Sequence, residues 1–299
     1  MTSIAFAGLG IMGGPMAANL VRAGHAVTGY DIARRGVDKL VAEGGHAADS
    51  IAAAVAGASV VITMLPADPH VEQVVLGPDG VLEHAAPGTL LIDMSSVTPG
   101  LAIRIASAAA ARGIRALDAP VSGGEAGAIE GVLSIMVGGA PEDFAAAEPV
   151  LSAMGTTIAL VGPAGAGQTV KVANQLIVAV NIQACAEAVV FLEKSGVDLA
   201  VALDVLNGGL AGSTVLTRKR DNFLNRSFAP GFRIDLHHKD MGNLLSAARS
   251  VGAPMPAASL VADFISALRN AGDGGLDHSA LLHNLDRMNG LDRPNGKAG

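Results

Sequence analysis

Residues 3–15 read Ser-Ile-Ala-Phe-Ala-Gly-Leu-Gly-Ile-Met-Gly-Gly-Pro, and this stretch decides the fold. The apolar run Ser3–Ala7 predicts a buried strand, and Gly8, Gly10 and Gly13 follow it with the spacing G-x-G-x-x-G. In such a turn the first glycine permits a tight reversal, the second lets a pyrophosphate approach the backbone, and the third allows close packing of helix and strand. The stretch therefore predicts a phosphate-binding turn that leads from a strand into a helix.

The elements after this turn favour binding of a dinucleotide. Pro15–Arg22 has the pattern of a helix, and its N-terminus would offer unpaired N–H groups and a positive dipole end to phosphates. A second strand, His25–Tyr30, leads to Asp31, eighteen residues after Gly13, where a carboxylate accepts hydrogen bonds from a ribose. The glycine spacing is weak by itself in a chain with 38 glycines, but a merely structural turn would not explain the strand, the helix and the acidic residue together. The residues expected to bind the dinucleotide here are Gly8, Gly10, Ile11, Met12, Gly13 and Asp31.

The end of the second strand also bears on the choice of cofactor. Asp31 should repel a phosphate on the ribose 2′-oxygen, which favours NAD. Arg34 and Arg35 follow, and a guanidinium there could bind a 2′-phosphate, although both residues could equally form the solvated first turn of the next helix. The sequence predicts NAD, with NADP as a possible second cofactor.

The 299 residues divide into two compositional styles, and a chain of this length is expected to form two domains. Residues 1–162 alternate apolar runs with helical stretches, which predicts crossover units around a mainly parallel sheet covered on both faces. Further strands are predicted at Val60–Leu65, Thr89–Met94, Arg115–Ala119, Leu133–Val137 and Thr157–Val161. Residues 163–299 predict an all-helical domain, with a long first helix at Gln168–Lys194 and a frayed tail from about residue 289. The expected fold class is α/β, with a Rossmann domain joined by that helix to an all-α domain.

Composition excludes several classes of protein. Half of the residues are hydrophobic and 16% are charged, which excludes intrinsic disorder. The net charge of −7 and the 3% of aromatic residues argue against nucleic-acid binding. The longest uncharged stretch, Ser50–Ala67, predicts a helix running into a strand rather than a membrane span. The only cysteine, Cys185, cannot form an intrachain disulfide, so we expect a cytoplasmic protein, and the eight histidines lack the spacing of a metal site.

Two further stretches carry groups suited to a small carboxylate substrate. Asp118–Gly124 ends a strand and enters a loop, where the N–H groups of Ser122, Gly123 and Gly124 could hold a carboxylate, although such turns also occur without a ligand. On the long helix, Lys171 and Asn174 lie three residues apart and so share one face. Lys171 could be a surface residue whose stem lies along a half-buried helix, or an acid that protonates an alkoxide in an interdomain cleft.

Four motifs occur in the order and spacing of one family, the β-hydroxyacid dehydrogenases, and the chain resembles that family from about Ile4 to His283. The motifs are Gly8–Gly13 with Met16–Leu20, Asp118–Gly139, Gly165–Gln175 and Lys239-Asp240. Within the family the likeness is greatest to the tartronate semialdehyde reductases, and it rests on residues 62–66, 93–96, 208–216 and 230–237. Gln175 stands where many 3-hydroxyisobutyrate dehydrogenases have a second asparagine, which agrees with that likeness.

The resemblance implies interconversion of a small semialdehyde acid and its hydroxyacid with NAD(P). It makes Lys171 the general acid/base and assigns further roles by position: Ser122, Gly123, Gly124 and Asn174 face the substrate, and Leu65, Pro66, Ser96 and Lys239 contact the cofactor. The first expected reaction is reduction of tartronate semialdehyde (2-hydroxy-3-oxopropanoate) to glycerate. The alternatives are 3-hydroxyisobutyrate dehydrogenation and reduction of glyoxylate or succinic semialdehyde.

The same residues bear on two other classes of protein. A non-catalytic NAD(P)-binding module would not need Lys171 and Asn174 one turn apart, and an imine-reducing relative would be expected to replace the lysine. A homodimer or homotetramer is expected, because the helical domain has more apolar surface than one sheet domain can cover.

Overall fold

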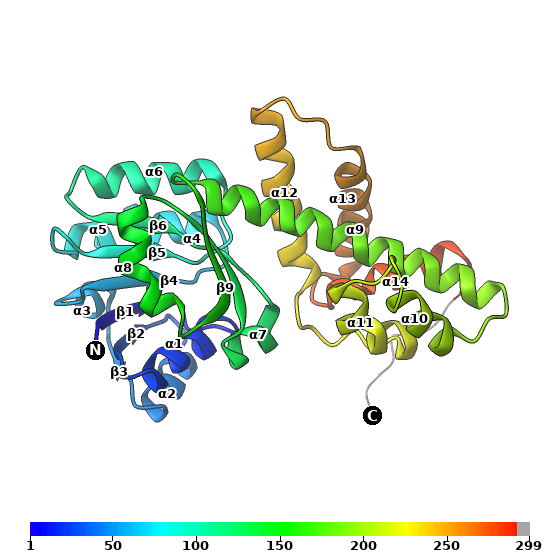
Figure 1. Cartoon of the computed structure of the whole chain (residues 1–299), viewed down its shortest axis with the longest axis horizontal. Helices are drawn as coiled ribbons and strands as arrows, with labels where there is room; N and C mark the ends of the chain where they lie inside the picture. The colour runs from blue at the N-terminus through cyan, green and yellow to red at the C-terminus, as the bar shows by residue number, and fades with distance from the viewer. Residues whose placement is uncertain (292–299) are drawn as a thin grey trace. The chain divides into compact units, whose positions relative to one another are not determined.

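The computed structural model describes residues 1–291, and spatial contacts divide the chain into two compact units, Met1–Lys171 and the part from Val172 onward (Figure 1). The division lies inside helix α9 (Ala166–Lys194), so the start of α9 belongs to the first unit. The expected boundary after residue 162 remains a prediction, because a division by contacts does not test which segment folds by itself. Most of the tail expected to fray, 292–299, lies outside the described residues.

The first unit is built on a nine-stranded sheet in the order β3-β2-β1-β4-β5-β6-β8-β7, with β9 beside β8. The strands are β1 (Ser3–Ala7), β2 (Ala26–Tyr30), β3 (His46–Ala47), β4 (Val60–Thr63), β5 (Leu90–Asp93), β6 (Arg115–Asp118), β7 (Val121–Ser122), β8 (Leu133–Gly138) and β9 (Gly155–Gly162). Strands β1 to β6 pair in parallel, whereas β8 is antiparallel to β6 and β7 and parallel to β9. The predicted mainly parallel sheet is therefore confirmed.

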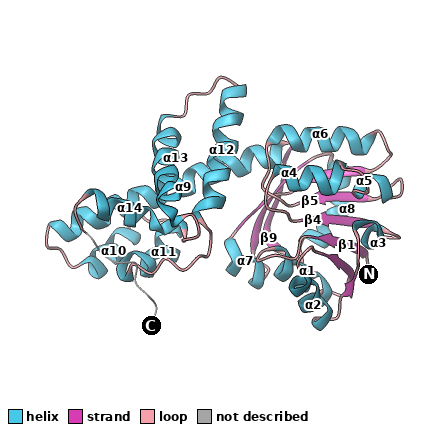
Figure 2. Ribbon diagram, turned by 180° about the vertical axis from the view of Figure 1, so that it is seen from behind, coloured by secondary structure: helices cyan, strands magenta, loops and turns pink. Residues whose placement is uncertain are grey.

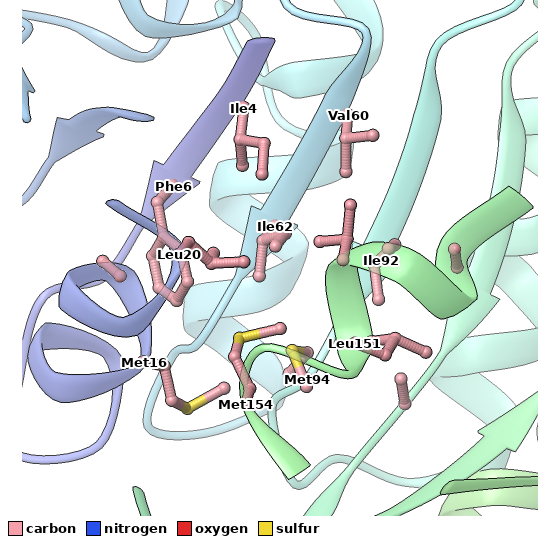
Figure 3. Packing of buried hydrophobic residues seen from close by; sticks show 14 of the residues in the cluster. Ile4, Phe6, Met16, Leu20, Val60, Ile62, Ile92, Met94, Leu151 and Met154 are labelled. Carbon is pink, nitrogen blue, oxygen red and sulfur yellow. The ribbon is translucent and has the colours of Figure 1, made fainter. Parts of the chain in front are cut away.

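Helices cover both faces of this sheet because successive side chains of its central strands point to opposite sides. Phe6, Ile62 and Ile92 pack on one side (Figure 3), and their neighbours Val61 and Leu91 pack on the other. The first side is covered by α1 (Gly13–Arg22), α2 (Arg34–Ala42), α7 (Gly124–Glu130) and α8 (Pro141–Leu151). The second is covered by α3 (Ile51–Val55), α4 (Asp68–Val71), the π-helical turn Glu72–Leu76, α5 (Val81–His84) and α6 (Pro99–Ala110).

Five parallel strands of the sheet end on one line. The register pairs Ala7 with both Tyr30 and Thr63, Thr63 with Asp93, and Asp93 with Asp118. Each of these is the last residue of its strand, so the loops that follow all leave from the same edge. In doubly wound sheets this carboxyl edge, where the strand order reverses between β1 and β4, is where ligands bind.

The second unit is helical over its described residues, and no strand is drawn there in Figure 2. After α9 it contains α10 (Leu199–Asn207), α11 (Thr214–Asn225), α12 (Ile234–Ser250), α13 (Pro256–Leu268), the turns Arg269–Asp273 and His278–Ala280, and α14 (Leu281–Met288). By length and composition α9 could cross a membrane. However, Ala179, Ile182, Ala186 and Val189 of α9 are fully buried in the core of this unit, as expected of the central helix of a folded domain.

Candidate active site

The glycine turn after β1 is built so that its middle glycine remains open. A Cβ on Gly8, which has φ +96°, would lie 2.3 Å from the carbonyl oxygen of Met64, and a Cβ on Gly13 would overlap the carbonyl of Gly8. A Cβ on Gly10 would meet no protein atom within 4 Å apart from its own neighbours in the chain. The first and third glycines are therefore required by the protein's own packing, and the second leaves space for a ligand. Helix α1 has no side-chain cap at its N-terminus, so the turn fits a pyrophosphate.

Asp31 lies where a ribose would bind, and it also holds the glycine turn through hydrogen bonds to the backbone. One carboxylate oxygen accepts the N–H of Leu9 at 2.6 Å and the other accepts the N–H of Ala33 at 2.7 Å. A carboxylate can accept about four hydrogen bonds, so Asp31 retains capacity for ribose hydroxyls. Of the two arginines beyond it, Arg34 pairs with Asp38 at 3.3 Å, a surface ion pair that a 2′-phosphate would have to displace.

The loops after β4 and β5 are joined through a buried carboxyl group. Asp93 accepts hydrogen bonds from the hydroxyl of Thr63 at 2.7 Å and the N–H of Ser95 at 3.1 Å. The Oγ of Ser95 in turn accepts the N–H of Leu65 at 2.9 Å. Burial raises the pKa of Asp93 to about 6, against the opposing effect of its hydrogen bonds. This network fixes the backbone beside three residues expected to contact the cofactor, Leu65, Pro66 and Ser96.

The segment expected to hold a substrate carboxylate has a conformation that requires glycine. Ser122 ends β7, Gly123 has φ +145° and Gly124 has φ +67°. A Cβ on Gly123 would lie 2.9 Å from a methyl of Leu133. Helix α7 begins at Gly124 and has no side-chain cap. The segment expected to be a loop is therefore a sharp turn from a short strand directly into a helix.

Lys171 is buried, with 7% of its surface exposed, at the start of α9. The first turn of α9 is anchored to the carboxyl edge of the sheet by Asp118, whose two oxygens accept the N–H of Gly165 at 2.7 Å and of Gln168 at 2.9 Å. The side chain of Gln168 donates to the carbonyl of Ser95 at 2.8 Å and accepts the N–H of Val97 at 3.1 Å. Burial raises the pKa of Asp118, and these N–H groups oppose that change.

Asn174 and Lys239 are connected in the second unit by two residues that the sequence left without a role. The amide of Asn174 donates to Oε1 of Gln175 at 2.9 Å, and Gln175 donates to Oδ2 of the buried Asp240. Lys239 pairs with Oδ1 of Asp240 at 3.1 Å. The predicted substrate contact and the predicted cofactor contact thus belong to one polar network.

The structure therefore gathers most of the predicted site residues at the carboxyl edge of the sheet in the first unit, and the other two, Asn174 and Lys239, within the second. Asp93, Asp118 and Gln168 were missed by sequence reasoning, because a single sequence does not show which strand-end carboxylate meets which helix. The only available signal was their position inside the family motifs. Within residues 1–291 no group of three or more histidine, cysteine or acidic side chains is arranged to hold a metal ion.

Comparisons with known proteins agree with this architecture. Residues 3–162 match the family profile of the NAD binding domain of 6-phosphogluconate dehydrogenase. Residues 165–285 match the profile described as NAD-binding of NADP-dependent 3-hydroxyisobutyrate dehydrogenase. Together the two profiles cover nearly all of the described chain.

Curated relatives and solved structures match over almost their whole lengths. A 3-hydroxyisobutyrate dehydrogenase of Pseudomonas aeruginosa is 43% identical, over 94% of this chain and 97% of that relative. A 2-hydroxy-3-oxopropionate reductase of Escherichia coli is 40% identical, over 95% of this chain and 97% of the other. The structure of a Mycobacterium tuberculosis 3-hydroxyisobutyrate dehydrogenase with L-serine superposes with a TM-score of 0.87 at 40% identity, covering 95% of this chain and 99% of that one. The chain therefore belongs to the β-hydroxyacid dehydrogenases, the NAD-dependent oxidoreductases of small hydroxy acids.

Proposed function

We propose that this protein reduces tartronate semialdehyde to glycerate, with Lys171 as the general acid. One observation carries the catalytic part of this proposal: Lys171 is buried, and it belongs to the same compact unit as the glycine turn of the NAD-binding domain. A lysine kept from solvent at the ligand-binding edge of such a sheet is suited to protonating a substrate rather than to solvating a surface.

The residues of the first unit would have separate roles in the reaction. When bound, NAD(P)H supplies the hydride that reduces the aldehyde carbon. The N–H groups of Ser122, Gly123 and Gly124 would hold the substrate carboxylate. The ammonium of Lys171 would donate its proton to the aldehyde oxygen as negative charge develops there, so that its contribution is concentrated in the transition state.

The preference for a hydroxyl-bearing substrate rests on Asn174. One of the two N–H groups of its amide donates to Gln175, and its Oδ1 can accept a hydrogen bond from a substrate donor. The hydroxyl of tartronate semialdehyde supplies such a donor, whereas the methyl of the 3-hydroxyisobutyrate series does not. The ammonium of a serine-like ligand would also do so, and the M. tuberculosis relative was solved with L-serine.

Replacement of the lysine tests the catalytic assignment. We expect Lys171→Met to lower kcat about 100-fold or more with NADH binding retained, because the transition state loses its proton donor. Lys194→Met is the matched control: it makes the same substitution at the exposed end of the same helix, where the amine donates to Asn289 at 2.7 Å, and it should leave kcat unchanged. Near-normal turnover of Lys171→Met would refute the assignment.

A substrate panel separates the proposed reaction from its alternatives. Oxidation of NADH and NADPH is followed with tartronate semialdehyde, methylmalonate semialdehyde, glyoxylate and succinic semialdehyde. We expect the highest kcat/KM with tartronate semialdehyde, and a preference for the methyl-bearing compound would point instead to 3-hydroxyisobutyrate dehydrogenation. Absence of turnover with the whole panel would favour a non-catalytic NAD(P)-binding module.

Three further assignments belong to the same proposal. NAD is the preferred cofactor, because Asp31 disfavours a 2′-phosphate, with NADP as a second possibility. The protein acts in the cytoplasm. It forms a homodimer or homotetramer, which agrees with large apolar side chains exposed on its helices, among them Ile177, Phe191, Val201 and Val205, and with the exposed Leu210 between α10 and α11.

A further inference from the structure

Asp118 ends β6 with its carboxylate directed at the first turn of α9. Its two oxygens each accept a backbone N–H, one from Gly165 and one from Gln168. Four N–H groups at the start of a helix have no partner within the helix, and a carboxylate there is also stabilised by the helix dipole. Asp118 is 5% exposed, so this anchor is formed inside the protein rather than at its surface.

The packing around this carboxylate leaves the helix little freedom. A Cβ on Gly167 would lie 2.3 Å from the carbonyl of Met136 and 2.7 Å from that of Asp118. A Cβ on Gly138 would lie 2.5 Å from a carboxylate oxygen of Asp118 and 2.8 Å from the N–H nitrogen of Gly167. Glycine is therefore required at both positions for the helix to approach the sheet this closely.

The side chain of Gln168 adds a second anchor on the neighbouring strand end. It donates to Ser95 and accepts from Val97, which lie in the loop after β5, and it is fully buried. The first turn of α9 is thus bound to two adjacent strands, β5 and β6. Lys171 lies three residues after Gln168, so it moves as one rigid piece with the anchored turn.

We propose that Asp118 and Gln168 are positioning residues that place the amine of Lys171 relative to the substrate-binding segment Ser122–Gly124. This inference rests on the proposed function, in which Lys171 is the acid. Asp118 fixes both partners at once, because it caps the helix that carries Lys171 and lies four residues before Ser122 in the same chain segment. Gly167, Gln168 and Asp118 would then all serve to hold the start of α9, and with it Lys171, in place.

Asp118→Asn tests the proposal at nearly constant size. An amide offers one acceptor oxygen, and its NH2 group would face a helix N–H, so the first turn should shift. Because a displacement of about 1 Å can cost about 100-fold, we expect kcat for tartronate semialdehyde to fall about 10- to 100-fold. The Kd for NADH, measured by its fluorescence, should change less than about twofold, because the glycine turn is not touched.

A double-mutant cycle with Lys171→Met separates positioning from general structural damage. If Asp118 acts through Lys171, adding Asp118→Asn to Lys171→Met should lower the residual rate no further. An equal fold-loss in both backgrounds, or an unchanged kcat in the single variant, would overturn the positioning role and leave the proposed function standing. Normal turnover of Lys171→Met would overturn both.

Two further variants complete the design. Asp143→Asn is the matched control: this carboxylate is also buried in the first unit, but it lies on α8 and contacts Arg115 at 3.4 Å, so kcat should not change.

If Asp118→Asn does not fold, Gln168→Met keeps the carboxylate cap and removes both side-chain hydrogen bonds of the second anchor. Gln168→Met should lower kcat as Asp118→Asn does, and adding it to Lys171→Met should lower the residual rate no further. Additive losses in the double variant would contradict the proposal.

Discussion

Two buried carboxyl groups at the ligand-binding edge of the first unit and two in the second unit differ in the partners that surround them. In the first unit, Asp93 and Asp118 accept hydrogen bonds from neutral hydroxyl and N–H groups. In the second, Asp277 pairs with Lys219 at 2.8 Å, and Asp286 pairs with Arg226 at 2.8 Å. Among the described residues Oδ2 of Asp93 has no hydrogen-bond partner, and of these four carboxyl groups only the two in the second unit have an opposite charge beside them.

The consequence appears in the pKa values. Burial raises the pKa of Asp93 to about 6 and raises that of Asp118 as well. Burial also acts on Asp277, yet the positive charges of His278 and Lys219 outweigh it and hold its pKa well below the usual range. The comparison teaches that Asp93 and Asp118 fix loops at a ligand-binding edge, at some cost in stability, whereas Asp277 and Asp286 pair with cations that stabilise the helical unit.

The largest effect is expected when a cation is removed from the second unit. Arg226 is 9% exposed, and its guanidinium contacts Asp286 on α14 and Glu193 on α9. Arg226→Met leaves the buried Asp286 uncompensated, so we expect the free energy of unfolding of this unit to fall by about 3–5 kcal/mol. Urea unfolding followed by far-ultraviolet circular dichroism measures the loss.

The single tyrosine makes this test specific to one unit. Tyr30 lies on β2 of the first unit, and the chain has no tryptophan, so tyrosine fluorescence reports on that unit. The fluorescence transition should move less than the dichroism transition. The double variant Arg226→Met/Asp286→Asn should recover part of the loss, and a double variant as unstable as the single one would argue against the charge as the cause.

A smaller effect, which depends on pH, is expected at Asp93. Its pKa in the folded protein lies above its unfolded value of about 3.8, so the folded state binds the extra proton between about pH 4 and 6. Stability from this group is therefore fully present below about pH 4 and is lost as the pH rises through about 6, by as much as about 3 kcal/mol. Asp93→Asn should flatten this part of the pH dependence.

Tyrosine fluorescence during urea unfolding at pH 4.5, 5.5 and 7.5 measures the effect, since Tyr30 and Asp93 lie in the same unit. A variant that loses stability with the same slope as the wild type would show that Asp93 is not the responsible group. Asp277 should act in the other direction, because its lowered pKa makes its contribution present at neutral pH and lost only under strongly acidic conditions.

The sequence predicted the framework of the first unit well because its elements are long or strongly apolar. Strand β1 matches its predicted bounds, and the helix predicted at Gln168–Lys194 is α9. The strands β3 and β7 were missed, since two residues cannot show an alternating pattern. The all-helical character of the second part was likewise confirmed over its described residues.

The site was predictable only where a local motif carries the chemistry. The glycine turn is such a motif, because its geometry depends on neighbouring residues. The anchor between Asp118 and Gln168 joins residues fifty positions apart, and the link from Asn174 to Asp240 is longer still. Such pairings depend on the sheet register and helix packing, which one sequence does not reveal.

The smallest effect is expected at Thr63, whose hydroxyl donates to Asp93. Thr63→Val keeps the shape and removes the donor, so we expect a loss of about 1–2 kcal/mol at pH 8, where the carboxylate is charged, and a smaller loss at pH 5. Thr89→Val is the matched control, because this buried hydroxyl meets the uncharged carbonyl of Ala58 at 3.5 Å and its loss should not depend on pH. If both variants showed the same small, pH-independent change, the neutral donors of the first unit would not be stabilising a charge, and the contrast with the ion-paired second unit would disappear.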